Sequence, residues 1–242
     1  MNLIVDIGNS SAKAAVFDGD PLLLRKRIDG DPKAELRRLA EESGAEACAV
    51  AVVGTAPGQM LETLERLLPR VLLVTGQTPA PLVCDYLTPH TLGADRLAAA
   101  VGAAALRPQC NLLIVDVGTC ITYDYVDERG HYLGGNISPG VGIRLRALHE
   151  QTARLPLVEA CNSWPRLGRT TQEAVLAGVM QGIENEIDGY ISQFERACRQ
   201  TAVFVTGGNG VRFVQHREVL RNDALVEIGL NRILLHHLRG AR

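Results

Sequence analysis

Short aliphatic runs that end at a glycine recur along this chain. They begin at Leu3, Ala47, Val71, Leu112 and Val203. Continuous apolar residues rich in Val and Ile, followed by a turn, are typical of strands that are buried on both faces of a sheet. The pattern therefore predicts a buried strand at each of these places.

Helical periodicity appears between the predicted strands. Residues 33–43 and 58–68 have apolar side chains at intervals of three and four, and residues 94–106 are almost all good helix formers. A further helix is expected over residues 222–238. Strands that alternate with helices indicate an α/β fold.

One long helix is predicted from Thr170 to Cys198. Thr170 and Glu173 have the spacing of a capping box, which marks a helix start. Three glycines interrupt this helix, at positions 178, 182 and 189. Close packing against a neighbouring element explains them better than a ligand does.

Composition indicates a folded protein without an obvious polyanionic partner. The 242 residues are 46% hydrophobic and 21% charged, which suits two domains or one duplicated unit, although one long domain is also possible. A net charge of −2 argues against nucleic acid as the main partner. The longest apolar run, residues 97–106, is about half of what a membrane-spanning helix needs. Asp6 interrupts the N-terminal apolar stretch, so no signal peptide is expected and the predicted location is the cytoplasm.

Cysteines and histidines are scattered without metal-binding spacing. No CxxC pair occurs among the six cysteines, so neither disulfides nor a zinc site are expected. The six histidines show no ligand pattern and are assigned no chemistry.

One motif occurs twice. LIVDIGNSSAKAAVF begins at Leu3, and LLIVDVGTCITYDYV follows 110 residues later. Each has an aliphatic strand, Asp-x-Gly, small polar residues and a second strand-like segment. Gly8 and Gly118 let main-chain N–H groups crowd around a phosphate, and Asp6 and Asp116 can hold a cation or its water shell. Side chains of Asn9, Ser10, Thr119 and Thr122 add hydrogen-bond donors.

A single Asp-x-Gly turn is common for structural reasons, whereas two copies at matching places favour a function. They indicate a nucleotide site built from two loops. No GxxxxGK occurs and no GxGxxG follows a strand, which argues against P-loop and Rossmann proteins.

The paired loops resemble the phosphate motifs of the acetate and sugar kinase, Hsp70 and actin superfamily. Further blocks are GADR at residues 93–96, GGNISPGVGIRLRALHEQTARLP from Gly134, TTQEAV from Thr170 and TGGNG from Thr206. In this order they resemble the type III pantothenate kinases, which use ATP to phosphorylate pantothenate in the first step of coenzyme A synthesis. The resemblance implies an α/β fold of two duplicated ribonuclease-H-like domains, residues 1–110 and 111–242, with a nucleotide cleft between them.

The resemblance implies an ATP site in three parts. The first loop supplies Asp6, Ile7, Gly8, Asn9, Ser10, Ser11, Ala12 and Lys13, and Asp6 helps to position Mg²⁺. In the second loop, Thr119 touches ATP and Asp116 binds an activating monovalent cation, K⁺ or NH₄⁺. Gly207 and Gly208 match the adenosine motif, although a plain tight turn would also explain them.

The resemblance also implies an acceptor site. Asp95 matches the general base that takes the proton of the pantothenate hydroxyl, and Arg96 can pair with the pantothenate carboxylate. Gly93 and Ala94 complete this block, and Tyr86 and Thr171 match substrate-contacting residues. Structural explanations remain open for three of them. Asp95 and Thr171 could simply occupy first turns of helices, and Tyr86 could be a packing residue.

Family members are dimeric with substrate pockets near the subunit interface, so the resemblance implies a homodimer. Most of a local basic stretch should be solvated, with one or two members facing the anionic substrates; it comprises Arg144, Arg146, Arg154, Arg166 and Arg169. Cys120 stands where the family more usually has Ala, and no catalytic role is expected for it.

Two rival functions remain. One is a kinase of the same superfamily acting on another small hydroxy or carboxylate acceptor. The other is a nucleotide-binding regulator without turnover, against which the intact aspartates at positions 6, 95 and 116 argue.

Overall fold

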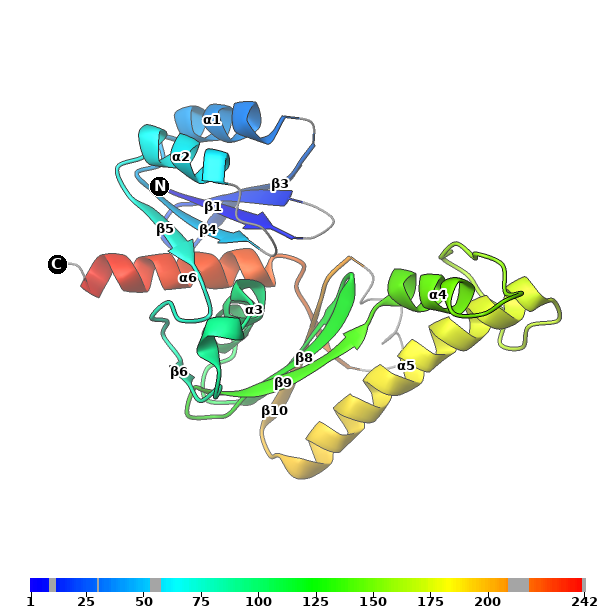
Figure 1. The fold of residues 1–242 in the computed structure, drawn as a ribbon. Helices are drawn as coiled ribbons and strands as arrows, with labels where there is room; N and C mark the ends of the chain where they lie inside the picture. The colour runs from blue at the N-terminus through cyan, green and yellow to red at the C-terminus, as the bar shows by residue number, and fades with distance from the viewer. Residues whose placement is uncertain (9–11, 30, 53–57, 209–217, 241–242) are drawn as a thin grey trace. The chain divides into compact units, whose positions relative to one another are not determined.

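The chain forms two compact units in a computed structural model that describes residues 1–8, 12–29, 31–52, 58–208 and 218–240 (Figure 1). The first unit comprises residues 1–110, 125–134 and 224–242, and the second comprises residues 111–124 and 135–223. Helices pack on sheets throughout, so the predicted α/β class is confirmed.

A five-stranded sheet with the order β3-β2-β1-β4-β5 forms the centre of the first unit. Its strands are β1 (Asn2–Ile7), β2 (Ala12–Phe17), β3 (Leu22–Ile28), β4 (Ala47–Val52) and β5 (Val71–Val74). β2 runs antiparallel to β1 and β3, whereas β4 runs parallel to β1 and β5. The three predicted strands in this region are thus confirmed. β3 was not predicted, because it is an edge strand whose LLLRKRI sequence has a polar half.

Helices cover both faces of the first sheet. They are α1 (Pro32–Ser43), α2 (Gly58–Leu67), α3 (Ala94–Leu106) and α6 (Leu225–Gly240), with a short 3₁₀ helix, η1 (Pro89–Thr91). On one face, leucines of α1 and α2 such as Leu36 and Leu64 pack with Leu3 and Val5 of β1 in a buried cluster. α6 contacts β1, β2 and β4 from the opposite face, as Figure 1 shows. The last helix of the chain therefore completes the core around its first strand.

Helices α3 and α6 meet at backbone distance. A Cβ atom built on Gly229 of α6 would lie 1.7 Å from the carbonyl oxygen of Ala98 in α3. One built on Gly102 of α3 would lie 2.2 Å from the carbonyl oxygen of Leu225. Only glycine fits at either position, so these two residues and the alanines of α3 set the spacing of the pair.

The second sheet has the order β11-β10-β7-β8-β9-β6. Its strands are β6 (Val83–Cys84), β7 (Asn111–Val117), β8 (Cys120–Val126), β9 (His131–Pro139), β10 (Thr201–Thr206) and β11 (Leu220–Arg221). Without β6, the order β9-β8-β7-β10-β11 repeats that of the first sheet. Parallel pairing of β10 with β7 and β11 also matches that of β4 with β1 and β5. The predicted duplication is therefore visible in the topology as well as in the paired motifs.

Two helices belong to the second unit, α4 (Val141–Glu150) and α5 (Thr171–Ala197). The predicted capping box is present, because the Thr170 hydroxyl accepts a hydrogen bond from the Glu173 N–H and the Glu173 carboxylate accepts one from the Thr170 N–H. α5 packs on β7 and β10 through a fully buried row of side chains: Met180, Ile183, Ile187 and Ile191.

The close packing expected for the α5 glycines is wrong within the described part of the chain. A Cβ atom on Gly178, Gly182 or Gly189 would meet nothing within 4 Å. All three lie off the buried row, so their lack of a side chain brings no neighbouring element closer.

The chain leaves the first unit after residue 110, the position at which the sequence analysis places the domain boundary. The chain then returns to the first unit twice, with residues 125–134 and with the C-terminal segment from residue 224. The C-terminal segment returns because α6 buries its apolar side on the first sheet.

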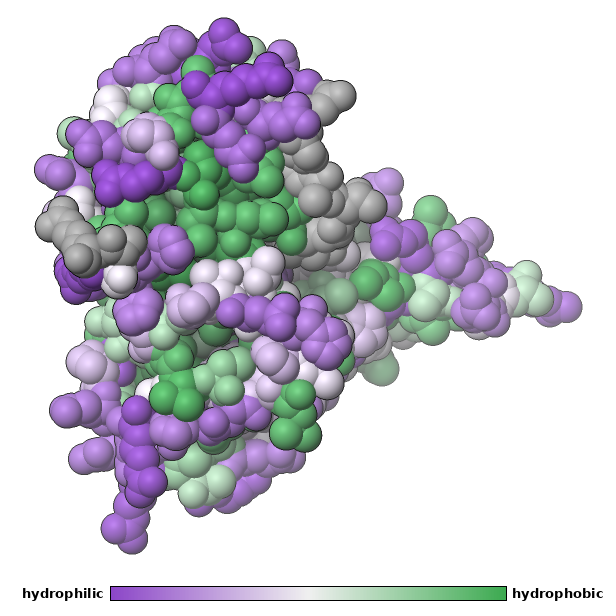
Figure 2. Space-filling model, turned by 60° about the vertical axis from the view of Figure 1, so that its left-hand side comes forward, coloured by the Kyte–Doolittle hydropathy of each residue, from purple (hydrophilic) through white to green (hydrophobic). Residues whose placement is uncertain are grey.

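Figure 2 shows one face on which hydrophilic residues cover most of the area and hydrophobic residues gather in its upper half. No helix in the described ranges combines the length and hydrophobicity required to cross a membrane.

Candidate active site

The first Asp-x-Gly turn lies at the end of β1 in the first unit. Asp6 is 8% exposed and lies opposite Lys13 across the antiparallel β1–β2 pair, as Ile7 lies opposite Ala12. Opposite charges at directly paired positions of neighbouring strands favour the pairing of those strands. Gly8 follows the strand. Asn9, Ser10 and Ser11 lie outside the described residues, so their predicted contacts stay predictions.

The second Asp-x-Gly turn lies between β7 and β8 in the second unit. Asp116 is half-buried near the end of β7, and Gly118 and Thr119 are exposed. The turn is closed by a hydrogen bond of 2.9 Å from the Gly118 N–H to the Cys120 carbonyl. Cys120 is half-buried and begins β8. The turn is thus held by its own backbone and leaves Gly118 and Thr119 at the surface of the second unit.

The Gly207 turn lies directly against the second Asp-x-Gly turn. Gly207 directly follows β10 with φ +85°, a conformation that favours glycine, and precedes Gly208. A Cβ atom on Gly207 would lie 2.4 Å from Oδ1 of Asp116 and 2.6 Å from the Val117 carbonyl oxygen. Two segments that the sequence separates by about ninety residues are therefore neighbours within the second unit.

A third segment, Pro139–Gly140, touches the same turn. The Gly140 N–H donates to the Thr119 carbonyl over 3.0 Å, and a Cβ atom on Gly140 would lie 2.4 Å from the Gly118 carbonyl oxygen. Gly140 is also the N-cap of α4. The sequence analysis included Gly140 in a motif block without assigning it a role; the Pro-Gly pair before a helical pattern is the signal that marks this close approach.

The GADR block forms the start of α3 in the first unit. Gly93 is the N-cap and Ala94 is buried. Asp95 is half-buried, and its Oδ1 accepts a hydrogen bond of 2.9 Å from the Arg96 N–H. This bond satisfies a helix-terminal donor and holds the carboxylate back over Gly93. Both the structural and the catalytic interpretation of Asp95 require this first-turn position.

Arg96 and Tyr86 lie together beside Asp95. The Arg96 side chain is largely buried, with the residue 6% exposed, and its guanidinium carbon lies 5.8 Å from the centre of the Tyr86 ring. The Tyr86 ring also packs on Tyr132 at a centroid distance of 6.1 Å. A guanidinium held on an aromatic face presents a fixed positive charge, as recognition of a carboxylate requires. The structure thus brings Tyr86, Asp95 and Arg96 into one cluster.

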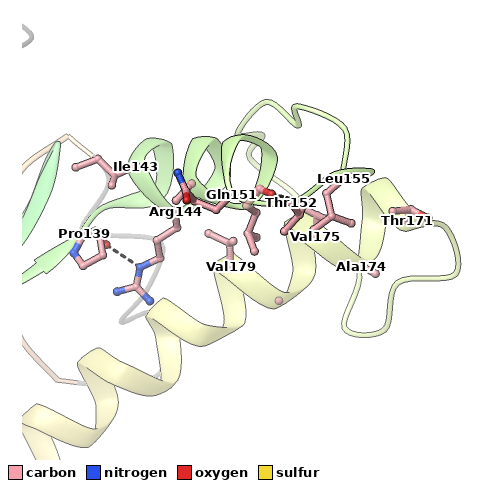
Figure 3. Close-up of a pocket in the computed structure, with 13 residues that line it drawn as sticks. Pro139, Ile143, Arg144, Gln151, Thr152, Leu155, Thr171, Ala174, Val175 and Val179 are labelled. Carbon is pink, nitrogen blue, oxygen red and sulfur yellow. Dashed lines mark hydrogen bonds between the residues drawn. The ribbon is translucent and has the colours of Figure 1, made fainter.

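Thr171 is exposed at the first turn of α5 and lines a cavity of about 720 Å³ in the second unit. Figure 3 shows this cavity between α4 and α5, with Arg144 near one end and Thr171 near the other. Its walls are mostly apolar and include Ile143, Leu155, Val175 and Val179. The apolar lining suits burial by another surface better than it suits a charged phosphate.

The basic stretch is solvated at four of its five positions. Those four are exposed: Arg146, Arg154, Arg166 and Arg169. Arg144 differs because its guanidinium donates to the Pro139 carbonyl, the Ser138 hydroxyl and the Glu186 carboxylate. Glu186 lies in α5, far from Arg144 in sequence, which is why the pairing was not predicted.

Electrostatics of this pair depend on three donors around Glu186. Burial alone would raise the pKa of the Glu186 carboxyl, but hydrogen bonds from Arg144, Ser138 and Tyr123 and the charge of Arg144 outweigh it and lower that pKa. Burial and the neighbouring Glu186 carboxylate raise the pKa of the Tyr123 hydroxyl. Glu186 is therefore held in its charged form.

Comparison with known proteins identifies a single family. A family model described as type III pantothenate kinase matches residues 2–193. A type III pantothenate kinase of Bacteroides fragilis is 42% identical over 97% of this chain and 97% of its own. Another, from Phocaeicola vulgatus, is 41% identical over 98% of this chain and 99% of its own.

Solved structures agree on the fold alone. A Campylobacter jejuni protein named as a Baf family transcriptional activator has a TM-score of 0.63 at 20% identity, over 98% of this chain and 99% of its own. A hexokinase from Thermus thermophilus has a TM-score of 0.51 at 14% identity, again over 98% and 99% of the two chains. The fold of this chain is thus similar to the folds of these two proteins.

Proposed function

The chain belongs to the type III pantothenate kinase family, and from this premise we propose that it transfers the γ-phosphoryl group of ATP to pantothenate. Members of this family are kinases, and the relatives are named for pantothenate. The product would be 4′-phosphopantothenate, the first intermediate of coenzyme A synthesis. The observation that carries the proposal is identity above 40% over nearly the whole of both chains.

We propose that both Asp-x-Gly turns hold the ATP phosphates. Support comes from the second unit, where exposed Gly118 and Thr119 lie at a turn packed against Gly207 and Gly140. Such a turn is rigid, and phosphoryl transfer depends mainly on positioning and charge neutralisation. Gly207 and Gly208 would lie against adenosine, because backbone without side chains leaves room for a purine and ribose.

Cations would be held by the two strand-end aspartates. The Asp116 carboxylate and the Val117 carbonyl oxygen both lie at Gly207, so this turn presents two oxygen ligands of the kind that K⁺ or NH₄⁺ prefers. Asp6 is a largely buried carboxylate at a strand end, which suits the water shell of Mg²⁺ bound to ATP. When bound, these ions would neutralise phosphate charge. The strand ends that carry Asp6 and Asp116 would fix the positions of the oxygen atoms that hold them.

We propose that Asp95 accepts the proton of the pantothenate primary hydroxyl. Its carboxylate is half-buried at the start of α3, where Oδ1 accepts a hydrogen bond from the Arg96 N–H. Arg96, stacked on Tyr86, would bind the pantothenate carboxylate. The Gly93–Ala94 backbone would complete the acceptor site.

We also propose a homodimer in which Thr171 contributes to the substrate site. The mostly apolar cavity between α4 and α5 supports this proposal, since a second copy could cover it. Sedimentation of the purified protein measures the subunit number. A monomer at micromolar concentration would exclude the homodimer.

The decisive experiment is phosphorylation of pantothenate by purified protein with ATP, Mg²⁺ and K⁺, run beside a panel of other hydroxy acids and sugars. Selective turnover of pantothenate is expected. Turnover of another acceptor would indicate the rival kinase, and nucleotide binding without turnover of anything would indicate a regulator.

Two further measurements separate the residue roles. Asp95→Asn should bind ATP normally and lose about 10²–10⁴-fold in kcat, because a general base typically contributes that much. A wild-type rate would exclude Asp95 as the base. Replacing K⁺ by Na⁺ should abolish most activity if Asp116 holds a monovalent cation, and indifference to the ion would exclude this role.

A further inference from the structure

A polar network links α5, α4 and β8 inside the second unit. Glu186 of α5 accepts a hydrogen bond of 2.8 Å from the Tyr123 hydroxyl and another of 2.5 Å from Nη2 of Arg144. The Tyr123 ring is fully buried and stacks on Tyr190 at a centroid distance of 3.8 Å. Glu186 is therefore held from two sides by elements that are rigid in themselves.

The network extends from Arg144 to the end of β9. Arg144 Nε donates to the Pro139 carbonyl over 2.7 Å, and Nη2 donates to the Ser138 hydroxyl over 2.7 Å. The side chains of Arg144 and Glu186 are only 20% and 25% exposed. A guanidinium can bridge several acceptors in fixed directions, so this arrangement fixes Ser138 and Pro139 relative to Glu186.

The segment held by Arg144 is the one that touches the second Asp-x-Gly turn. Gly140 follows Pro139 directly, and its N–H donates to the Thr119 carbonyl. There is no room for a side chain between Gly140 and the Gly118 carbonyl. A displacement of Pro139 therefore moves the backbone on which Gly118 and Thr119 rest.

We propose that Arg144 and Glu186 are positioning residues, which hold residues 138–140 against Gly118 and Thr119 and thereby keep the second phosphate loop in its ATP-binding geometry. This proposal rests on the proposed function of that loop. Arg144 acts through the loop and does not itself bind phosphate. Two of its three guanidinium nitrogen positions already donate to protein acceptors.

The charge of the pair explains why these residue types are needed. A lysine could neutralise Glu186 but could not also span the Ser138 hydroxyl and the Pro139 carbonyl, because it presents a point charge on a flexible stem. A glutamine at 186 would keep the shape and one acceptor while losing the charge. The two substitutions should therefore weaken nucleotide binding by smaller factors than complete removal of the guanidinium does.

The test measures binding of a non-hydrolysable ATP analogue with Mg²⁺ by calorimetry, on the full chain. Arg144→Met should raise the Kd for the analogue about tenfold, and Arg144→Lys and Glu186→Gln about threefold each. Arg196→Met is the matched control, since Arg196 is exposed in the last turn of α5, and it should bind like wild type. The double variant Arg144→Met/Glu186→Gln should bind the analogue no more weakly than Arg144→Met, because both substitutions break the same ion pair.

Steady-state kinetics and melting temperatures separate positioning from general stability. Positioning predicts that KM for ATP rises with the Kd while KM for pantothenate stays unchanged. Variants with a lowered Tm but a wild-type Kd and KM for ATP would overturn the proposal, since the network would then be merely structural. If Arg144→Met does not fold, the isosteric Glu186→Gln decides by the same criteria.

Failure of the proposed function looks different. A wild-type protein that binds the analogue but does not phosphorylate pantothenate would refute the substrate, and the comparison of Kd values would still support or overturn the positioning role. A wild-type protein that does not bind the analogue would overturn both.

Discussion

The backbone contact between α3 and α6 gives the sharpest prediction of the structure. In Gly229→Ala, the new methyl carbon would lie 1.7 Å from the Ala98 carbonyl oxygen and 2.5 Å from the Ala98 carbonyl carbon. Ordinary contact begins at about 3.4 Å, so the helices would have to separate by roughly half that distance. The overlap cannot be relieved by a side-chain rotation, because the Ala98 atoms are main chain and the position of a Cβ atom is fixed by its own backbone.

The sign of the effect separates this mechanism from helix propensity. Alanine is favoured over glycine inside a helix by about 1 kcal/mol, so an unhindered Gly229→Ala would stabilise the protein. Overpacking in a closely packed interior costs about 1–3 kcal/mol and can cost more. Because the overlap with main chain is large, we take the upper end of this cost and expect a net loss of about 2 kcal/mol, which for a protein of this size lowers Tm by roughly 4–8 °C.

Urea and thermal unfolding, followed by circular dichroism, measure the change. Gly182→Ala in α5 is the matched control, since its Cβ would meet nothing within 4 Å and the substitution should raise Tm slightly. If Gly229→Ala also raised Tm, the close approach of α3 and α6 and the spacing argument built on it would be refuted. A loss at Gly182 would instead place a partner molecule against that face of α5.

Three more predictions concern single polar contacts. The pKa of Glu186 is lowered below its usual 4.5, so the charged carboxylate stabilises the folded protein above that pH, and this stabilisation is lost as the pH falls through the folded pKa. Glu186→Gln should therefore make Tm depend less on pH in the acid range. Thr170→Ala removes the cap of α5 and should cost about 1 kcal/mol in urea unfolding, whereas an unchanged midpoint would mean that the capping box adds nothing. Arg25→Met leaves the fully buried Glu227 carboxylate without the guanidinium that lies 2.8 Å away, and should lower the free energy of unfolding by about 3–5 kcal/mol. If the uncompensated charge is the cause, the double variant Arg25→Met/Glu227→Leu should recover much of this stability.

Elements with a strong local signal could be predicted from the sequence. The aliphatic strands β1, β4, β5, β7 and β10 were predicted, and so was α3, with the same bounds as observed. The capping box placed the start of α5 within one residue. Each of these signals lies within a few consecutive residues, which is why one sequence suffices to read it.

Features that depend on distant residues were not predictable. β3 and β6 are short or polar edge strands, and the place of α6 in the first unit depends on packing against strands two hundred residues earlier. Within the site, the sequence pointed to Asp116 and Gly207 separately, but their contact came only from the parallel pairing of β7 with β10. No local pattern indicated the Arg144–Glu186 pair. Because Arg144 lies in a stretch of basic residues, the sequence suggested that its side chain is solvated like those of its neighbours.

The return of the chain to its beginning constrains how the protein can be made. Asn231 of α6 accepts a hydrogen bond from Asn2 of β1 and donates one to the Gly19 carbonyl, so the last helix is bonded to the first strand and the turn after the second. During synthesis, the face of the first sheet that α6 covers stays largely uncovered until residues 225–240 have emerged, since α3 contacts mainly β4 there. Premature termination anywhere before that helix would therefore release a chain whose earliest-made unit cannot close, and such fragments should be substrates for chaperones and proteases rather than partly active enzymes.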